Sequence, residues 1–224
     1  MSSPRVDATI VLPIKEICRA KSRLEIPVYL RQAIALRLAE NSLGVAVAAV
    51  SARRVIVVTS DALVQELAGQ VGAGVVNDGG QGLNVAAARG VAAARAAFPE
   101  LRTNVLVADL PWLTLPSLEH TLAVLARSDS SVIVSDAQGV GTTLLSLPAK
   151  CTVQMVFGRD SAIRFAAQGC HALSSAPQAL RMDLDTTRDL RAMLLRAAFT
   201  EDTESAEPGT SFFGRWNRLL PFAV

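Results

Sequence analysis

The chain has little of what several common kinds of functional site require. Its 224 residues include only three cysteines and two histidines. Cys18, Cys151 and Cys170 have neither CxxC nor zinc-ligand spacing, which argues against a disulfide framework and a structural zinc site. With only His120 and His171, a histidine-based triad or metal site is equally disfavoured.

Long apolar runs and a strong net charge are also missing. No stretch of 18 apolar residues occurs, and the first seven residues lack the apolar core of a signal peptide, so we expect no membrane span and a cytoplasmic location. The 22 Lys+Arg and 20 Asp+Glu are scattered and leave a formal charge of +2, which disfavours nucleic acid as a partner. Neither GxGxxG nor a P-loop motif is found.

What the sequence does contain is the alternation of an α/β domain. Half of the residues are apolar, and β-branched apolar runs alternate with alanine- and leucine-rich segments of helical period. We therefore predict a single-domain, doubly wound α/β fold with a mixed sheet. Strands are expected at 8–13, 54–59, 74–77, 104–108 and 131–135, then at 142–147 and near 181–182. Helices are expected at 28–50, 62–72, 83–98 and 116–127, and from Ser161 and Thr187.

The composition changes near the C-terminus. Residues 1–199 form the predicted domain, and residues 200–211 are a polar, acidic linker. In the tail, residues 212–224, Phe213, Trp216 and Leu220 form one apolar stripe on a short helix. Packing against the same domain is the simpler interpretation of this stripe, and a homodimer contact is the alternative.

In an open parallel sheet, ligands bind beyond the carboxyl ends of the strands. Four cations follow the first strand within nine residues: Lys15, Arg19, Lys21 and Arg23. Because Arg binds phosphate bidentately and Lys supplies a compact charge, this loop is a candidate site for a phosphate tail. The alternative is a solvated basic loop.

Three aspartates follow other predicted strands. Asp109 comes after the fourth strand, and Asp183 and Asp185 are two residues apart, so that in an extended segment they point to one side. Three converging carboxylates repel one another unless they are protonated or bind a divalent cation, and an all-oxygen ligand set favours magnesium. The alternative is that Asp109 and Asp185 only cap helices.

Two further loops could contact an anionic ligand. Gly79, Gly80 and Gly82 would allow close backbone approach, and the amide of Asn84 could bind a base or a ribose. Further along, Gly139 to Thr142 and then Gly158 precede the helix that opens at Ser161, where free amides favour a second anion. Two anion sites beside a metal cluster are the layout of a reaction in which an anionic acceptor attacks a nucleotide phosphate.

Taken in order from about Ile10 to Leu190, these motifs resemble the phospholactate guanylyltransferase family. The motifs are Pro13-Ile14-Lys15, Ala20-Lys21-Ser22-Arg23-Leu24, Gly82-Leu83-Asn84, Ala108-Asp109-Leu110-Pro111, Gly139-Val140-Gly141-Thr142, Phe157-Gly158 with Ser161, and Asp183-Leu184-Asp185-Thr186 with Asp189-Leu190.

The resemblance implies a nucleotidyltransferase fold like that of the molybdenum-cofactor guanylyltransferases. It also implies GTP and Mg²⁺, and a small phosphorylated carboxylic acid as acceptor: 2-phospholactate, phosphoenolpyruvate or 3-phosphoglycerate. GMP transfer to this acid, with release of pyrophosphate, would serve coenzyme F-420 biosynthesis. The implied nucleotide-binding residues are Lys15, Lys21, Arg23, Gly82 and Asn84, with Lys15, Arg23 and Asp109 catalytic. The implied metal ligands are Asp109, Asp183 and Asp185, and the implied acceptor-binding residues are Thr142, Gly158 and Ser161.

Two positions depart from the family pattern. Thr143 replaces a common asparagine and Phe165 a common histidine. Both departures are expected near the acceptor loops, and a smaller side chain at position 143 would favour a longer acid such as 3-phosphoglycerate. The alternative functions are a nucleotidyltransferase with a molybdenum-cofactor or sugar-phosphate acceptor, and a non-catalytic nucleotide-binding module.

Overall fold

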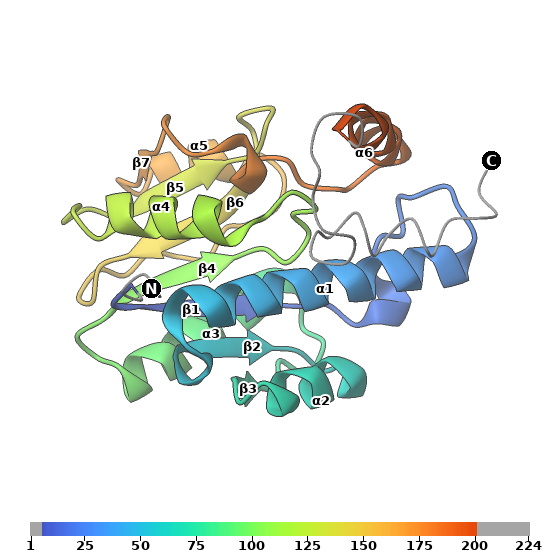
Figure 1. The fold of residues 1–224 in the computed structure, drawn as a ribbon. Helices are drawn as coiled ribbons and strands as arrows, with labels where there is room; N and C mark the ends of the chain where they lie inside the picture. The colour runs from blue at the N-terminus through green and yellow to red at the C-terminus, as the bar shows by residue number, and fades with distance from the viewer. Residues whose placement is uncertain (1–5, 201–224) are drawn as a thin grey trace.

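A seven-stranded sheet lies between two layers of helices (Figure 1). The computed structural model describes residues 6–200. The strands follow the order β3-β2-β1-β4-β6-β5-β7 across the sheet. Their bounds are β1 Ala8–Pro13, β2 Val55–Val58, β3 Gly74–Val76, β4 Arg102–Leu106, β5 Val132–Ser135, β6 Thr142–Leu147 and β7 His171–Ala172.

The sheet is mixed, as predicted. β1 pairs in parallel with β2 and β4, β2 with β3, and β5 with β7, whereas β6 is antiparallel to both β4 and β5. β5 therefore runs in the same direction as β4. As a result, the loops after β1 to β5 and the first residue of β6, Thr142, all lie at one edge of the sheet, its carboxyl edge.

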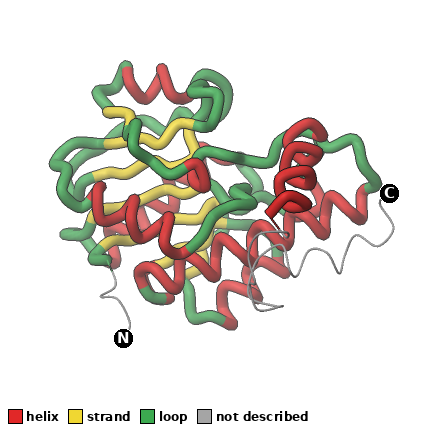
Figure 2. The backbone as a smooth tube through the Cα atoms, turned by 45° about the horizontal axis from the view of Figure 1, so that its top comes forward, coloured by secondary structure: helices red, strands yellow, loops and turns green. Residues whose placement is uncertain are grey.

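The helices cover both faces of the sheet (Figure 2). α1 (Val28–Val50), α2 (Ala62–Gln70) and α4 (Leu115–Leu125) pack on the face that carries Ile10 and Leu12 of β1. α3 (Leu83–Ala97) and α5 (Ser161–Ala166) pack on the opposite face, with Val11 and Val105. Successive residues of β1 thus enter different cores, as the alternating directions of side chains in a strand require.

α3 approaches the sheet closely because of one glycine. A Cβ at Gly90 would lie 2.2 Å from Cγ1 of Val11 and 2.7 Å from Cγ2 of Val58, so no larger residue fits without movement. This contact sets how closely the middle of α3 approaches β1 and β2, and Gly82 and Asn84 lie at the start of the same helix.

α6 (Thr187–Thr200) packs beyond this edge, on a small core of its own. Leu190 and Met193 of α6 contact Leu24 in the cationic loop and Ile34 and Leu38 of α1. The contact joins the loop after β1 to the segment just before α6, which carries Asp183 and Asp185.

The strand predicted near residues 181–182 is wrong. The amides of Arg181 and Met182 donate to the carbonyl of Gln178 at 2.9 and 3.1 Å, which makes a turn after the 3₁₀ helix η3 (Gln178–Leu180). The apolar residues here, Leu180 and Leu184, are buried in the core and do not mark a paired strand. The last strand across the sheet, next to β5, is β7.

α1 is long and apolar enough to cross a membrane by length and composition alone, which differs from the expectation that no segment qualifies. Half of its apolar window is buried, and it packs on α4 and β1 within the core of the domain. The predicted acidic linker and tail lie outside the described residues, apart from Thr200 at the end of α6.

Candidate active site

Lys21 connects the cationic loop to the aspartates at the carboxyl edge. Its Nζ lies 3.0 Å from Oδ2 of Asp109 and 3.5 Å from Oδ1 of Asp185. Nη1 of Arg23 lies 3.7 Å from Oδ2 of Asp185. The Lys21 side chain is only 9% exposed, whereas that of Arg23 is 77% exposed. Although burial lowers the pKa of Lys21, the carboxylates of Asp109 and Asp185 outweigh it and raise this pKa above its usual range.

Backbone hydrogen bonds bring the acidic segments together. The amide of Leu184 donates to the carbonyl of Asp109 at 3.1 Å, which fixes the segment of Asp183 and Asp185 beside the loop after β4. This bond explains why residues more than 70 positions apart share one site.

Neither Asp109 nor Asp185 caps a helix, so that alternative is wrong. The cap of α4 is Thr114, which accepts a hydrogen bond from the amide of Ser117. At α6, the Thr186 hydroxyl accepts from the amide of Asp189, and the Asp189 carboxylate accepts from the amide of Thr186, which forms a capping box. The carboxylate of Asp185 is thereby left to contact the two cations.

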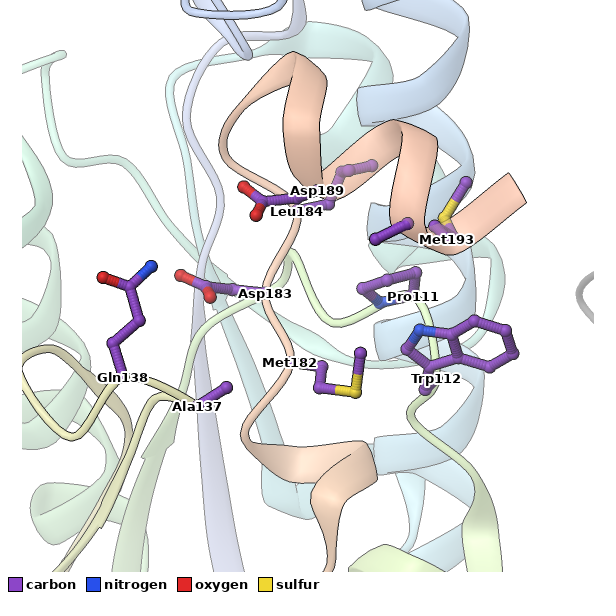
Figure 3. Close-up of a pocket in the computed structure, with 10 residues that line it drawn as sticks. Pro111, Trp112, Ala137, Gln138, Met182, Asp183, Leu184, Asp189 and Met193 are labelled. Atoms are coloured by element: carbon purple, nitrogen blue, oxygen red, sulfur yellow. The ribbon is translucent and has the colours of Figure 1, made fainter. Parts of the chain in front are cut away.

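Asp183 is the most perturbed acid of the site. Burial, followed by the neighbouring charges of Asp109 and Asp185, raises the pKa of its carboxyl to about 7. Asp183 lines a pocket with residues from the loops after β4 and β5 and from α6, and its carboxylate points toward the side on which Gln138 lies (Figure 3). The proton and the charge of this group are therefore both available near neutral pH.

The acidic cluster fits a divalent cation that other ligands help to hold. Oδ1 of Asp109 is buried and has no hydrogen-bond partner. Within residues 6–195, no three Asp, Glu, His or Cys side chains form a complete metal-binding group. Mg²⁺ usually takes one or two carboxylates and completes its shell with water and substrate phosphates, so this partial set suits it. Asp109 bonds to Lys21 through Oδ2 and keeps Oδ1 unpaired, and Asp183 forms no ion pair within the described residues. Both oxygens of Asp185, in contrast, contact a cation, Oδ1 that of Lys21 and Oδ2 that of Arg23.

The loop after β1 is fixed to the end of β2. The amide of Ile17, in the 3₁₀ helix η1 (Ile17–Arg19), donates to Oδ2 of Asp61 at 2.8 Å, and the Ser60 hydroxyl donates to Oε1 of Glu16 at 3.2 Å. Lys15 is exposed and forms no ion pair with any residue of the described part. Of the two lysines predicted to bind the nucleotide, Lys21 alone lies in the acidic cluster.

The glycine loop leaves open space at the start of α3. Gly79, Gly80 and Gly82 all have a positive φ, of 64°, 68° and 93°, so the loop depends on residues without a side chain. No atom lies within 4 Å of a Cβ built at Gly82. A nucleotide could approach the backbone at this position.

Asn84 connects the glycine loop to the acceptor loop. Its Nδ2 donates to the carbonyl of Phe157 at 3.2 Å, and the Phe157 amide donates to its Oδ1 at 2.7 Å. The amide is thus used to position the loop that ends at Gly158. The sequence predicted that Asn84 binds guanosine, and this stays a prediction.

The predicted acceptor residues contact one another, since the amide of Ser161 donates to the carbonyl of Gly158 at 3.1 Å. The Ser161 hydroxyl donates to Oγ1 of Thr142 at 3.0 Å, and both side chains are buried. Gly158 is exposed with a φ of 106°, and no atom lies within 4 Å of a Cβ built there. Gly158 is thus exposed while the two hydroxyls are buried, and the acceptor role of these residues stays a prediction.

Both departures from the family pattern lie in the interior. The hydroxyl of Thr143 donates to the carbonyl of Leu180 at 2.5 Å and also lies 3.2 Å from the carbonyl oxygen of Val134. Phe165 is fully buried against Phe157, with ring centroids 5.2 Å apart. Both positions lie beside the acceptor loops, as expected, because Thr143 follows Thr142 in β6 and Phe165 packs on Phe157. Their side chains are buried, and the preference for a longer acid stays a prediction.

Sequence analysis missed Asp136, which shapes the turn between β5 and β6. Its carboxylate accepts hydrogen bonds from the amides of Val140 at 2.9 Å and Gly141 at 2.7 Å, and its charge contributes to the raised pKa of Asp183. A Cβ at Gly141 would lie 2.4 Å from Oδ2 of Asp136. An acid directly after a strand, as at Asp109, was the signal that could have found it.

The raised pKa of Asp183 predicts a pH-dependent stability in metal-free buffer. An unfolded aspartate ionises near pH 4, whereas Asp183 in the folded chain holds its proton to about pH 7. Between these values the folded state binds more protons, so this group's contribution to the free energy of unfolding falls as the pH rises. Asp183→Asn removes the contribution. In denaturant titrations with EDTA, we expect the stability of the variant minus that of the wild type to increase from about pH 4 to about pH 7. A difference that does not change with pH would contradict this origin of the shift.

Known proteins resemble this chain over most of its length. The family model described as "Guanylyl transferase CofC like" matches residues 8–206. The phosphoenolpyruvate guanylyltransferase of Thermomonospora curvata is 42% identical over 189 residues, which cover 83% of this chain and 82% of that protein. The enzyme of the same name from Streptomyces coelicolor is 40% identical over 190 residues, covering 83% and 89%.

Solved structures with low sequence identity share the fold. A cytidylyltransferase from Leptospira borgpetersenii has a TM-score of 0.55 at 13% identity and covers 96% of this chain and 94% of its own. A 4-diphosphocytidyl-2C-methyl-D-erythritol synthase has a TM-score of 0.54 at 14% identity, covering 84% and 98%. The fold is thus that of nucleotidyltransferases. Because the family match spans most of the sequence, this chain is a nucleotidyltransferase enzyme that belongs to the CofC-like guanylyl transferase family.

Proposed function

We propose that this enzyme transfers GMP from GTP to phosphoenolpyruvate, with release of pyrophosphate, at the carboxyl edge of its sheet. The carrying observation is that Asp109 and Asp185 contact a buried lysine, with Asp183 near both carboxylates and one buried oxygen of Asp109 unpaired. The choice of acceptor is supported by the names of the relatives at 42% and 40% identity. The product would serve coenzyme F-420 biosynthesis in the cytoplasm.

The nucleotide would lie between the cationic loop and the start of α3. Lys15, Lys21 and Arg23 would contact the triphosphate, and the open backbone at Gly82 would face the guanosine. The bonds from Ile17 to Asp61 and from Ser60 to Glu16 hold the loop in this position before the ligand arrives. A preorganised loop lowers the ordering cost of binding.

The reaction needs no general base. At neutral pH the phosphate oxygen of phosphoenolpyruvate already carries the negative charge with which it attacks the α-phosphorus of GTP. A bond forms between this oxygen and the α-phosphorus. The bond between the α-phosphorus and the oxygen that bridges it to the β-phosphorus breaks, and pyrophosphate leaves with that oxygen and the electron pair of the bond. This chemistry accounts for a site that is built without a histidine, because no proton has to be removed from the nucleophile.

Catalysis would therefore consist of positioning and charge stabilisation. Lys15 and Arg23 would offset the charge that grows on the α-phosphate and the departing pyrophosphate. Asp109 and Asp183, with Asp185 beside them, would hold Mg²⁺, which when bound polarises the phosphoryl oxygens. Gly158 and the pair of Thr142 and Ser161 would receive the acceptor, and Asn84 would hold their loop against α3.

Incubation of the enzyme with GTP, Mg²⁺ and one acceptor at a time tests the proposal. We expect phosphoenolpyruvate to give a guanosine diphospho adduct by mass spectrometry and an equal amount of pyrophosphate. 2-Phospholactate, 3-phosphoglycerate and a hexose phosphate serve as competing acceptors. A faster reaction with one of these would overturn the choice of acceptor, and no acceptor-dependent pyrophosphate with any of them would overturn the proposed activity.

A further inference from the structure

Lys21 occupies the space beside two of the carboxylates proposed to hold the metal. Its ammonium contacts Asp109 at 3.0 Å and Asp185 at 3.5 Å, and its side chain is 9% exposed. The backbone of Lys21 has a φ of 53°, a left-handed conformation that residues with a side chain seldom adopt. The loop thus keeps the Lys21 ammonium against Asp109 and Asp185 although its backbone conformation is unfavourable.

Resting on the function proposed above, we infer that Lys21 is the stand-in cation of the nucleotide-free site. It moves from Asp185 to the phosphates when the metal and GTP bind together. Lys21 thereby couples the affinity for the metal to the affinity for GTP. It does so as a positioning residue, through its contacts with the carboxylates and the phosphates.

One ammonium satisfies the acidic cluster only in part. While Lys21 bonds to Oδ2 of Asp109, Oδ1 of the same carboxylate stays buried without a partner. The second contact, to Asp185, is 3.5 Å long, well beyond the 2.7–2.9 Å or so of a strong charge-assisted hydrogen bond. The contact to Asp185 is therefore the weaker of the two and the first to break. A lysine has a flexible four-carbon stem, so its ammonium can move while its backbone stays in place.

Electrostatics then links the metal to the nucleotide. A divalent ion bound to Asp109 and Asp183 would lie a few ångströms from the Lys21 ammonium, and like charges at that distance repel strongly in a half-buried site. The triphosphate of GTP supplies several negative charges to which the ammonium can turn. The metal alone should therefore bind weakly, and the metal with GTP should bind tightly.

Binding of Mn²⁺ to the full chain, followed by the loss of its free EPR signal, measures this dependence without any turnover. Titrations are made with and without GTP, and with no acceptor acid. In the wild type we expect GTP to tighten Mn²⁺ binding, and by linkage Mn²⁺ to tighten GTP binding by the same factor. In Lys21→Met, which keeps the length and removes the charge, Mn²⁺ alone should bind about tenfold tighter or more. The effect of GTP on Mn²⁺ affinity should shrink correspondingly.

Arg23→Gln is the matched control, because Arg23 contacts the same Asp185 carboxylate from solvent. Since its side chain is 77% exposed, water screens its charge, and we expect the affinity for Mn²⁺ measured without GTP to change by less than about threefold. If Lys21→Met does not fold, Lys21→Gln allows the same comparison, because its amide can still donate to Asp109 without a charge.

Mn²⁺ binding that is unchanged or weaker in the Lys21 variants would overturn the inference, because a lysine that only braces the loop predicts that result. An equal increase of Mn²⁺ affinity in Arg23→Gln and in Lys21→Met would overturn it as well, because loss of any positive charge near Asp185 would then explain the result. The assay of GMP transfer is separate, so a failure of the proposed reaction and a failure of this inference are distinguishable.

Discussion

Asp109→Asn should lower the rate of GMP transfer by on the order of 10²-fold or more and leave the fold intact. The variant keeps the size of the side chain and removes the charge of the carboxylate that faces both Lys21 and the proposed metal position. Because Oδ1 of Asp109 is buried without a partner, it is the oxygen with the most to gain from a cation. Pyrophosphate release under saturating GTP and acceptor measures the rate.

Asp129→Asn is the control for this variant. Asp129 is an exposed acid that comes before β5, at the opposite edge of the sheet, so its neutralisation changes the net charge equally and should leave the rate within about twofold. Raising the Mg²⁺ concentration should recover part of the activity of Asp109→Asn, because a weakened site fills at higher metal concentration. Full activity with an unchanged Mg²⁺ dependence would contradict the role of Asp109.

Gly90→Ala should destabilise the protein by about 1–3 kcal/mol or more, because the added methyl group overpacks the interface between α3 and the sheet. The new Cβ would meet Cγ1 of Val11 at 2.2 Å and Cγ2 of Val58 at 2.7 Å, and both side chains belong to central strands. For a domain of this size, a loss of that order lowers Tm by several degrees, about 2–4 °C for each kcal/mol. Thermal unfolding followed by circular dichroism gives the value.

Gly44→Ala is the matched change in another helix. Gly44 lies within α1, and no atom lies within 4 Å of a Cβ built there, so alanine should raise stability by roughly 0.5–1 kcal/mol through its better helix propensity. The two variants thus have opposite expected signs for the same substitution. A Gly90→Ala protein as stable as the wild type would show that α3 can move away from the sheet at little cost.

Much of the fold could be predicted because its signals are local. The apolar runs of β1 and β2 are buried throughout, and the capping box of Thr186 and Asp189 marks the start of α6 in the sequence itself. The grouping of Asp109 with Asp185 was predicted from the rule that strands end at one edge, but only Asp109 follows a strand. The hydrogen bond from the Leu184 amide to the Asp109 carbonyl brings Asp185 to the same place, and Lys21 contacts both.

The rest could not be predicted because it depends on contacts between distant segments. In the sequence, Lys15 and Lys21 are equivalent members of one basic loop, yet one is exposed and the other is buried among carboxylates. The amide of Asn84 is equally suited to a nucleotide and to the backbone of Phe157, 73 positions away. A strand was predicted near residues 181–182 because the apolar residues Leu180 and Leu184 flank them. Both leucines are buried, but apolar spacing alone does not show whether the backbone groups pair with another strand.

Anomalous diffraction from crystals grown with Mn²⁺ and GTP is the most direct test of where the transfer takes place. The account predicts a manganese peak within about 2.2 Å of carboxylate oxygens of both Asp109 and Asp183, with a phosphate oxygen of GTP in the same coordination shell. A manganese–GTP complex bound away from the carboxyl edge, with Asp109 still paired only to Lys21, would contradict it.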